Sequence, residues 1–259
     1  MYNLLKRTKK KWWLAIKILP FVFIVLIAKF FVHTLGYEVI GLNALFTSVV
    51  AGTIFLLGFL ISGVLTDYKE AEKIPGELSA SLEALYDDAY TLYKAKDLQP
   101  AKKFIAYEKE LTLLLDEWFY RKEHTQTILH KISSMNEFFI AFDKEGIQPN
   151  IIIKMKAEQH ALRKLIIRMH TIRDTDFVPS AYAIVEVLAF AIACGLVFIK
   201  IGSVFESFFF TILVSFLLFY MIPLIKHLDD PFDYVAHSKT GTEISLKPFV
   251  DIKKRLEDE

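Results

Sequence analysis

Residues 39–65 read VIGLNALFTSVVAGTIFLLGFLISGVL, a run without any charged side chain. A helix needs ~20 predominantly apolar residues to cross the hydrocarbon core of a membrane, so this run is long enough to span it. Three further runs are long and apolar, and they cover residues 12–32, 179–201 and 205–225. The helical pattern of the quoted run continues without a break as far as Lys73. The sequence therefore predicts an all-α membrane protein with four transmembrane helices per subunit, in two pairs separated by a long polar segment.

The composition supports this class and excludes several others. Of the 259 residues, 54% are hydrophobic, more than the about 45–50% of typical soluble domains. The formal net charge of +1 gives no case for a nucleic-acid partner. Because Cys194 is the single cysteine, neither a disulfide within the chain nor a cysteine-based zinc site is possible. The seven histidines are scattered and no Ser-His-Asp or Cys-His arrangement is visible, so we expect no metal site, no cofactor and no enzymatic activity.

Basic residues before the first apolar run indicate the orientation. Lys6, Arg7 and the three lysines at 9–11 precede this run, whereas the links at 33–38 and 201–204 contain no Lys or Arg. Loops rich in Lys and Arg remain on the cytoplasmic side of a membrane. We therefore expect both termini and the polar middle segment in the cytoplasm, and the protein in the plasma (inner) membrane.

The middle segment, residues 67–178, is highly charged but carries helical patterns. Apolar residues recur every three or four positions in four successive stretches that are separated by short breaks. One apolar stripe per stretch is typical of helices that pack against one another. The sequence predicts a cytosolic helical domain between two membrane segments, residues 1–66 and 179–226, with a cytosolic tail at residues 227–259.

Three stretches, in this order and at this spacing, resemble the bestrophin family of pentameric ion channels. They are IFLLGF at residues 54–59 with YKEA at 68–71, TDFVPSAY at 175–182, and LDDPF at 228–232. Together with the predicted topology, the resemblance covers nearly the whole chain. It implies a homopentamer of four-span subunits in a lipid bilayer, with one central pore that passes small inorganic ions and a vestibule formed by the middle segment.

The resemblance places a hydrophobic pore neck on the second span, at Ala51, Phe55 and Phe59. The sequence itself shows that these residues lie four positions apart, so they share one helix face. Apolar rings can gate a pore by excluding water from it. The alternative is that Phe55 and Phe59 pack against lipid or against neighbouring helices.

Departures from the family pattern bear on ion selectivity. The family usually has Arg where this chain has Leu60 and Asp67, and the acidic run that forms a calcium clasp in animal members is absent after Phe232. Calcium requires ~6–8 oxygen ligands, so we do not expect calcium activation. Anions such as chloride are the favoured class, and a cation-selective channel is the alternative.

Residues before the third span are candidates for a lower constriction, because the family narrows a second time in this region. They are Ile172, Arg173 and Asp176. If these side chains point toward the axis, repeated subunits create a charged ring. The alternative is that the charged residues form salt bridges at a helix end.

Glu186 lies about two turns inside the third span, where a carboxylate is costly unless it faces water or a partner. Three placements of Glu186 are compatible with this position. Its side chain lines the permeation path, bonds a polar group on a neighbouring helix, or lies in the polar interface of the membrane. A proton-coupled transporter that uses Glu186 is therefore one rival function. A non-conducting membrane-anchored scaffold or signalling protein, with the middle helices as a docking platform, is the other.

Two further predictions concern charged residues near span ends. Lys29 is expected to extend its side chain to the membrane interface, as long cationic side chains do. Asp229, Asp230 and Pro231 are expected to form a structural turn into the tail, in which the carboxylates bond local backbone amides.

Overall fold

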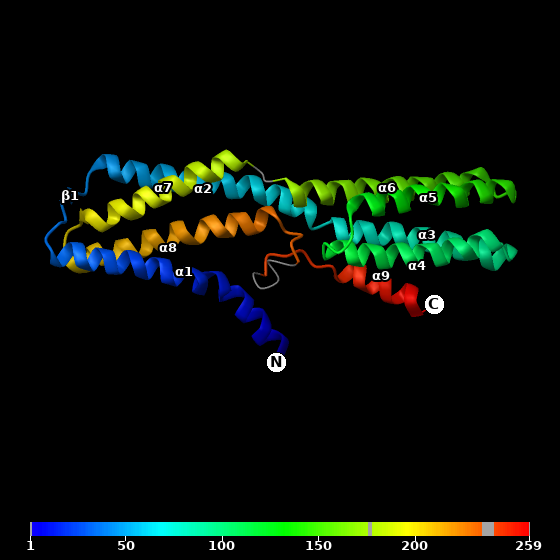
Figure 1. The fold of residues 1–259 in the computed structure, drawn as a ribbon, viewed down its shortest axis with the longest axis horizontal. Coiled ribbons are helices and arrows are strands. Elements are labelled where there is room, and N and C mark those ends of the chain that lie inside the picture. The colour runs from blue at the N-terminus through cyan, green and yellow to red at the C-terminus, as the bar shows by residue number, and fades with distance from the viewer. Residues whose placement is uncertain (1, 176–177, 235–240, 259) are drawn as a thin grey trace. The chain divides into compact units, whose positions relative to one another are not determined.

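A computed structural model of the chain describes residues 2–175, 178–234 and 241–258 (Figure 1). Within these residues the chain is mostly helical, with two strands of two residues each. The elements in chain order are α1 (Tyr2–Thr34), β1 (Ile40–Gly41), α2 (Ala44–Ala71), α3 (Ile74–Lys96), α4 (Gln99–Phe119), α5 (Thr125–Lys144), α6 (Pro149–Asp174), α7 (Pro179–Phe198), β2 (Ile199–Lys200), α8 (Val204–Asp229) and α9 (Lys247–Asp258).

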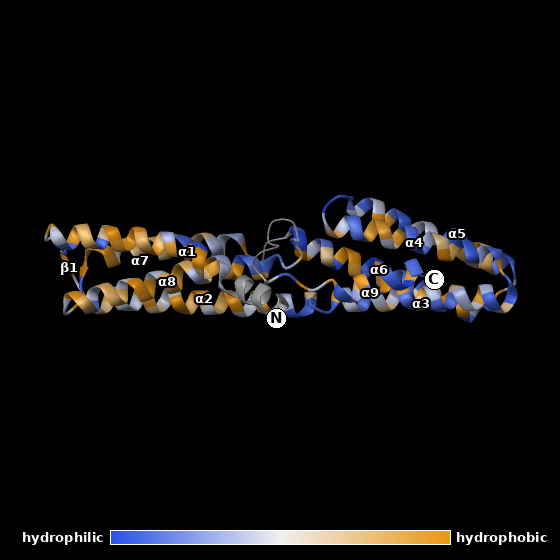
Figure 2. Ribbon diagram, turned by 90° about the horizontal axis from the view of Figure 1, so that it is seen from below, coloured by the Kyte–Doolittle hydropathy of each residue, from blue (hydrophilic) through white to orange (hydrophobic). Residues whose placement is uncertain are grey.

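The elements divide into two compact units, which are described separately. The first contains α1, α2 as far as Tyr68, α7 and α8, and the second contains α3 to α6 and α9. Figure 2 shows that the helices of the first unit are coloured predominantly as hydrophobic, whereas those of the second alternate between hydrophobic and hydrophilic residues.

The first unit contains the four apolar runs predicted from the sequence. In the described part of the chain, four helical stretches are long and apolar enough to cross a membrane; the first is Trp12–Thr34 within α1, and the others contain α2, α7 and α8. Leu57 and Leu60 of α2 pack in one apolar cluster with Val185 and Ala189 of α7. The prediction of four membrane-length helices is confirmed.

Helix α8 lies beside both α1 and α7. Its buried residues Ser207, Thr211 and Ser215 recur every four positions on one face. Small side chains at this spacing allow helices in a membrane to approach closely. They therefore suit the packing of α8 against its neighbours, and Figure 1 shows α1 and α8 side by side.

Helix α2 begins five residues later than the sequence pattern predicts. Ile40 and Gly41 instead pair in parallel with Ile199 and Lys200 as strands β1 and β2. The side chain of Asn43 then accepts a hydrogen bond of 2.8 Å from the backbone N–H of Phe46 and so caps the first turn of α2. The apolar run was predicted as one helix because neither the distant strand partner nor the cap interrupts its hydropathy.

The prediction that Lys29 extends to the membrane interface is wrong. Its side chain is fully buried, with Nζ 2.7 Å from Oε1 of Glu38 and a hydrogen bond to the carbonyl oxygen of Ile199. Nδ1 of His33 lies 3.0 Å from Oε2 of the same carboxylate. Burial alone raises the pKa of Glu38, but the hydrogen bonds from Lys29 and His33 outweigh it and lower this pKa below 4.5. The β1–β2 pair and the preceding link thus close over Lys29 and supply its counter-ion.

The second unit is a bundle of the four helices predicted for the middle segment. The predicted apolar stripes are buried. On α3, for example, no solvent-exposed surface remains on Leu78, Leu82, Leu85 and Ala89. The sequence did not predict α9 as a helix. Its buried residues Phe249, Ile252 and Leu256 lie on one face, which packs against α3 and α4.

Candidate functional site

Helix α2 has two faces with different surroundings. Thr53, Leu57, Leu60 and Val64 are buried, and the three apolar residues among them belong to the cluster shared with α7 and α8. On the other side of the helix the rings of Phe55 and Phe59 are 74% and 67% exposed. In the part of the chain that the structure describes, no helix therefore covers the face that bears both phenylalanines.

The residues on this open face have a distinctive order. At about 100° per residue, six exposed positions between Ser48 and Thr66 fall within about 40° of the direction of Phe55. They are Ser48, Ala51, Phe55, Phe59, Ser62 and Thr66. Two aromatic rings thus lie in the middle of the face, with small or hydroxyl-bearing side chains beyond them in both directions.

The open face differs from the other exposed surfaces of the first unit. Exposed positions in the middle of α1, α7 and α8 carry large apolar side chains such as Phe23, Phe190 and Leu213, which suit contact with lipid. On α2 the hydroxyl of Ser48 donates to the carbonyl of Ala44 at 2.8 Å, and that of Thr66 donates to the carbonyl of Ser62 at 3.1 Å. The proton of each hydroxyl is satisfied, and the oxygen remains on the open side as an acceptor.

Ala51, Phe55 and Phe59 were predicted from the sequence, whereas the flanking hydroxyl residues were missed. Ser48, Ser62 and Thr66 continue the same spacing of three or four residues. Extending the helical pattern in both directions from Phe55 identifies them. The structure therefore places all three predicted neck residues on one face and adds polar ends to it.

Arg173, predicted near a lower constriction, points into its own bundle. Its side chain is 7% exposed and its guanidinium lies 4.7 Å from the centre of the Trp118 ring. Nη1 also donates a hydrogen bond of 3.3 Å to the carbonyl oxygen of Trp118. Ile172 is half-buried, and Asp176 lies outside the described residues. A ring formed by Arg173 requires this side chain to leave Trp118.

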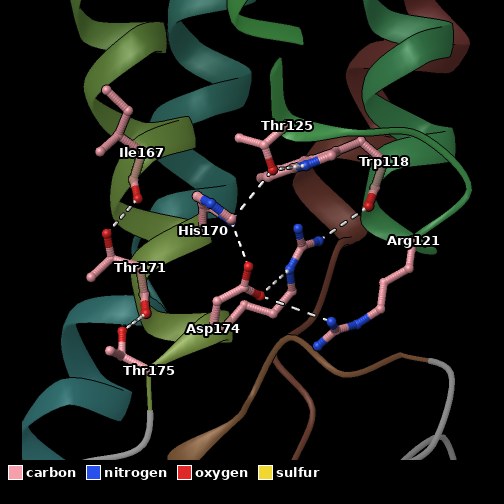
Figure 3. Close-up of polar contacts among 9 residues, drawn as sticks. Trp118, Arg121, Thr125, Ile167, His170, Thr171, Asp174 and Thr175 are labelled. Carbon is pink, nitrogen blue, oxygen red and sulfur yellow. Dashed lines mark hydrogen bonds and ion pairs between the residues drawn. The ribbon is translucent and has the colours of Figure 1, made fainter. Parts of the chain in front are cut away.

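Figure 3 shows the polar network around the end of α6, in which Asp174 has three basic neighbours. Nδ1 of His170 lies 2.9 Å from its carboxylate, Nε of Arg173 lies at 3.5 Å, and Nη1 of Arg121 lies at 3.9 Å. Further along, Nε1 of Trp118 donates to the hydroxyl of Thr125 at 3.0 Å. These contacts join the end of α6 to the turn between α4 and α5.

Glu186 forms an ion pair between two helices of the first unit. Its partner is Lys226 of α8, and both side chains are about half exposed. One turn before Glu186, the hydroxyl of Tyr182 donates a hydrogen bond of 3.0 Å to Asp229. The geometry thus provides Glu186 with a bonded group on the neighbouring helix, which is one of the three arrangements considered from the sequence.

The residues predicted to form the turn after α8 occupy its end. Asp229 is the last residue of α8 and accepts the bond from Tyr182, and Asp230 is the C-cap. The carbonyl oxygen of Pro231 accepts a hydrogen bond of 3.1 Å from the backbone N–H of Ile244. Among the described residues no group of three or more His, Cys, Asp or Glu side chains is placed to hold a metal ion.

Comparisons with known proteins extend these observations. The chain is similar in structure to two crystal structures of single-substitution variants of a bacterial bestrophin homologue from Klebsiella pneumoniae. For the first, the TM-score is 0.77 at 15% identity over 93% of this chain and 97% of the other. For the second, the TM-score is 0.72 at 17% identity over 95% and 96%. At these identities the likeness establishes a shared fold.

A search of curated proteins finds no match to the sequence. The sequence does match the Bestrophin-like domain over residues 14–235, which include all four apolar helices from Leu14 onward and the whole of α3 to α6. With its four membrane-length helices, it has the features of an integral membrane protein. The chain therefore belongs to the Bestrophin-like family.

Proposed function

We propose that the protein is a homopentameric ion channel that passes small inorganic ions through an axial pore. Five copies of α2 line this pore, and Ala51, Phe55 and Phe59 form its neck. The observation that carries the proposal is the open face of α2, which no helix among the described residues covers and on which polar side chains flank two aromatic rings.

The length of this face suits a transmembrane pore. Ser48 and Thr66 are separated by a helix length of about 27 Å at ~1.5 Å per residue, close to the ~30 Å of a hydrocarbon core. The hydroxyl-bearing residues at both ends make the mouths of the pore more polar than its middle, so that water can accompany an entering ion there. In the middle, rings of phenylalanine side chains exclude water and so raise the barrier to ion passage.

The remaining features of the proposal concern orientation and selectivity. The basic residues at positions 6–11, before the first apolar run, orient both termini and the second unit toward the cytoplasm, with the protein in the inner membrane. There five copies of the second unit form a cytosolic vestibule. Chloride and similar anions are the proposed permeant class, although the face from Ser48 to Thr66 itself carries no charge.

Reconstitution into liposomes tests this function. With a salt gradient across the bilayer, we expect an ion flux that protein-free liposomes lack and a reversal potential on the side predicted for anions. The mass of the detergent-solubilised particle is expected to correspond to five chains. An impermeable bilayer that contains folded protein contradicts the channel, and a dimer contradicts the axial pore.

A further inference from the structure

A cavity lies within the second unit, between the end of α2, the start of α3 and α6. Its volume is about 700 Å³, a size within the range of small-molecule sites. One side of the cavity is formed by residues 70–77 at the end of α2 and the start of α3, and the other side by residues 160–171 of α6. The lining residues are Glu70, Lys73, Ile74, Glu77, His160, Arg163, Lys164, Leu165, Ile167, Arg168 and Thr171.

The charges of this cavity favour an anion. Two Lys and two Arg side chains face two carboxylates, which leaves a formal charge of +2 with histidine neutral. Arg168 is held by Glu70, with Nη2 2.5 Å from Oε2, and Arg163 donates to the hydroxyl of Ser133 at 2.9 Å. Within the described residues, no hydrogen bond or ion pair engages the side chain of Lys73 or Lys164.

The floor of the cavity is apolar. Ile74 is 3% exposed and Leu165 is 9% exposed, while Ile167 at the rim is 46% exposed. A halide ion fills only a small part of this volume and gains nothing from the apolar floor. A phosphate monoester carries a charge of about −2 at neutral pH and several acceptor oxygens, and its organic part covers the apolar floor.

We propose that this cavity binds a phosphate monoester, with Lys73 and Lys164 contacting the phosphate and Ile74 and Leu165 contacting its organic part. Arg163 and Arg168, both already fixed by neighbours, present their guanidinium groups to the same anion. Glu70 and Glu77 repel ligands of higher negative charge. The proposal does not rest on the channel function, because binding is measured without ion flux.

The ligand has two possible sources with the same chemistry. One is a soluble organic phosphate. The other is the headgroup of an anionic lipid, since Glu70 follows Leu65, the end of the span predicted from the sequence, by only five residues. The experiment below separates these sources.

The test uses the full chain in detergent and measures the unfolding temperature during titration with glycerol 3-phosphate. Chloride salt at equal ionic strength serves as the reference. A ligand that binds only the folded state raises the unfolding temperature. We expect Lys73→Gln and Lys164→Gln each to weaken binding by about tenfold or more, as for loss of a charge-assisted contact. Lys156→Gln is the matched control, because Lys156 is an exposed lysine of α6 that lies outside this cavity.

A second arm uses phosphatidylcholine nanodiscs containing phosphatidic acid, a phosphate monoester, or phosphatidylglycerol, a phosphodiester. A rise in unfolding temperature specific to phosphatidic acid and lost in Lys164→Gln supports the site with a lipid as its source. A response to glycerol 3-phosphate that is lost in the same variant supports it with a soluble source. The absence of both responses overturns the proposal, including the case in which a second copy of the chain fills the cavity. Equal weakening by Lys156→Gln also overturns it.

Discussion

Phe55 and Leu57 lie two residues apart on α2, but Phe55 is 74% exposed and Leu57 is 2% exposed. Two residues turn a helix by about 200°, so the two side chains lie on opposite faces. Leu57 packs in the cluster that joins α2 to α7 and α8. Phe55 has no such partner within residues 2–175, 178–234 and 241–258, and the proposed pore follows from this asymmetry.

Replacing both Phe55 and Phe59 by alanine is expected to raise ion flux in liposomes by about tenfold, as for a barrier lower by ~1.4 kcal/mol. The reason is that a wider, less apolar neck admits water more readily. Phe190→Ala is the control, because Phe190 is an equally exposed aromatic residue on α7, and it should leave the flux unchanged. Flux that is the same in all three proteins refutes the gating role of the neck.

Glu38→Gln is expected to destabilise the first unit by about 3 kcal/mol, because Lys29 is fully buried and would lose its counter-ion. The measurement is the unfolding temperature in detergent. Combining Lys29→Met with Glu38→Gln removes both charges and should restore most of the lost stability. If the double variant is less stable than Glu38→Gln alone, the ion pair is not the cause.

Glu108 gives a specific pH dependence to the second unit. Its side chain is fully buried on α4, and neither carboxylate oxygen has a hydrogen-bond partner in the described part of the chain. Burial, and after it the negative charge of Asp87, raises the pKa of Glu108 well above 4.5. In the folded state Glu108 therefore keeps its proton at pH values where the unfolded chain has lost it.

The contribution of Glu108 to the free energy of unfolding is therefore most favourable below pH 4.5. This contribution falls as the pH rises from 4.5 toward the raised pKa of the folded state. The slope for one proton is about 1.4 kcal/mol per pH unit. Glu108→Gln should remove this slope and raise stability at neutral pH, as measured by unfolding across a pH series. Glu117→Gln, at an exposed position of α4, should keep the slope. A slope of the same size in Glu108→Gln would falsify the assignment.

Phe249 anchors α9, since its side chain is fully buried against the bundle and its ring lies 4.8 Å from that of Phe119. Phe249→Ala is expected to cost about 3 kcal/mol and to expose α9 to limited proteolysis. Val250→Ala changes the neighbouring residue, which is 52% exposed, and should alter neither property. If both variants resist proteolysis equally well, α9 is attached mainly by its ion pairs, such as that between Lys253 and Asp116 at 2.7 Å.

Structural features that produce a local sequence pattern could be predicted from the sequence. The four apolar helices and the four helices of the second unit follow from run length and from the spacing of apolar residues. Phe55 and Phe59 follow from spacing on one helix together with the family resemblance. Their role in a pore stays a prediction, because it depends on contacts between chains.

Structural features that depend on residues far apart in the chain could not be predicted from the sequence. The burial of Lys29 results from the pairing of Ile40 with Ile199, far along the chain. The local hydropathy around Lys29 does not indicate that pairing. Glu108 was missed for a different reason. It occupies a stripe position between Phe104 and Leu111, both buried, but a carboxylate at such a position is normally assigned to the solvent face.

Thiol modification at position 59 tests the pore most directly. In a Cys194→Ser background, which removes the single native cysteine, Phe59→Cys is reconstituted and ion flux is measured before and after a membrane-impermeant, charged thiol reagent. Phe190→Cys in the same background serves as the reference. If the open face of α2 lines a water-filled path, the reagent reduces flux through Phe59→Cys and leaves Phe190→Cys unchanged. If flux through Phe59→Cys persists and its thiol remains unmodified, the face of α2 does not meet water and the proposed pore is wrong.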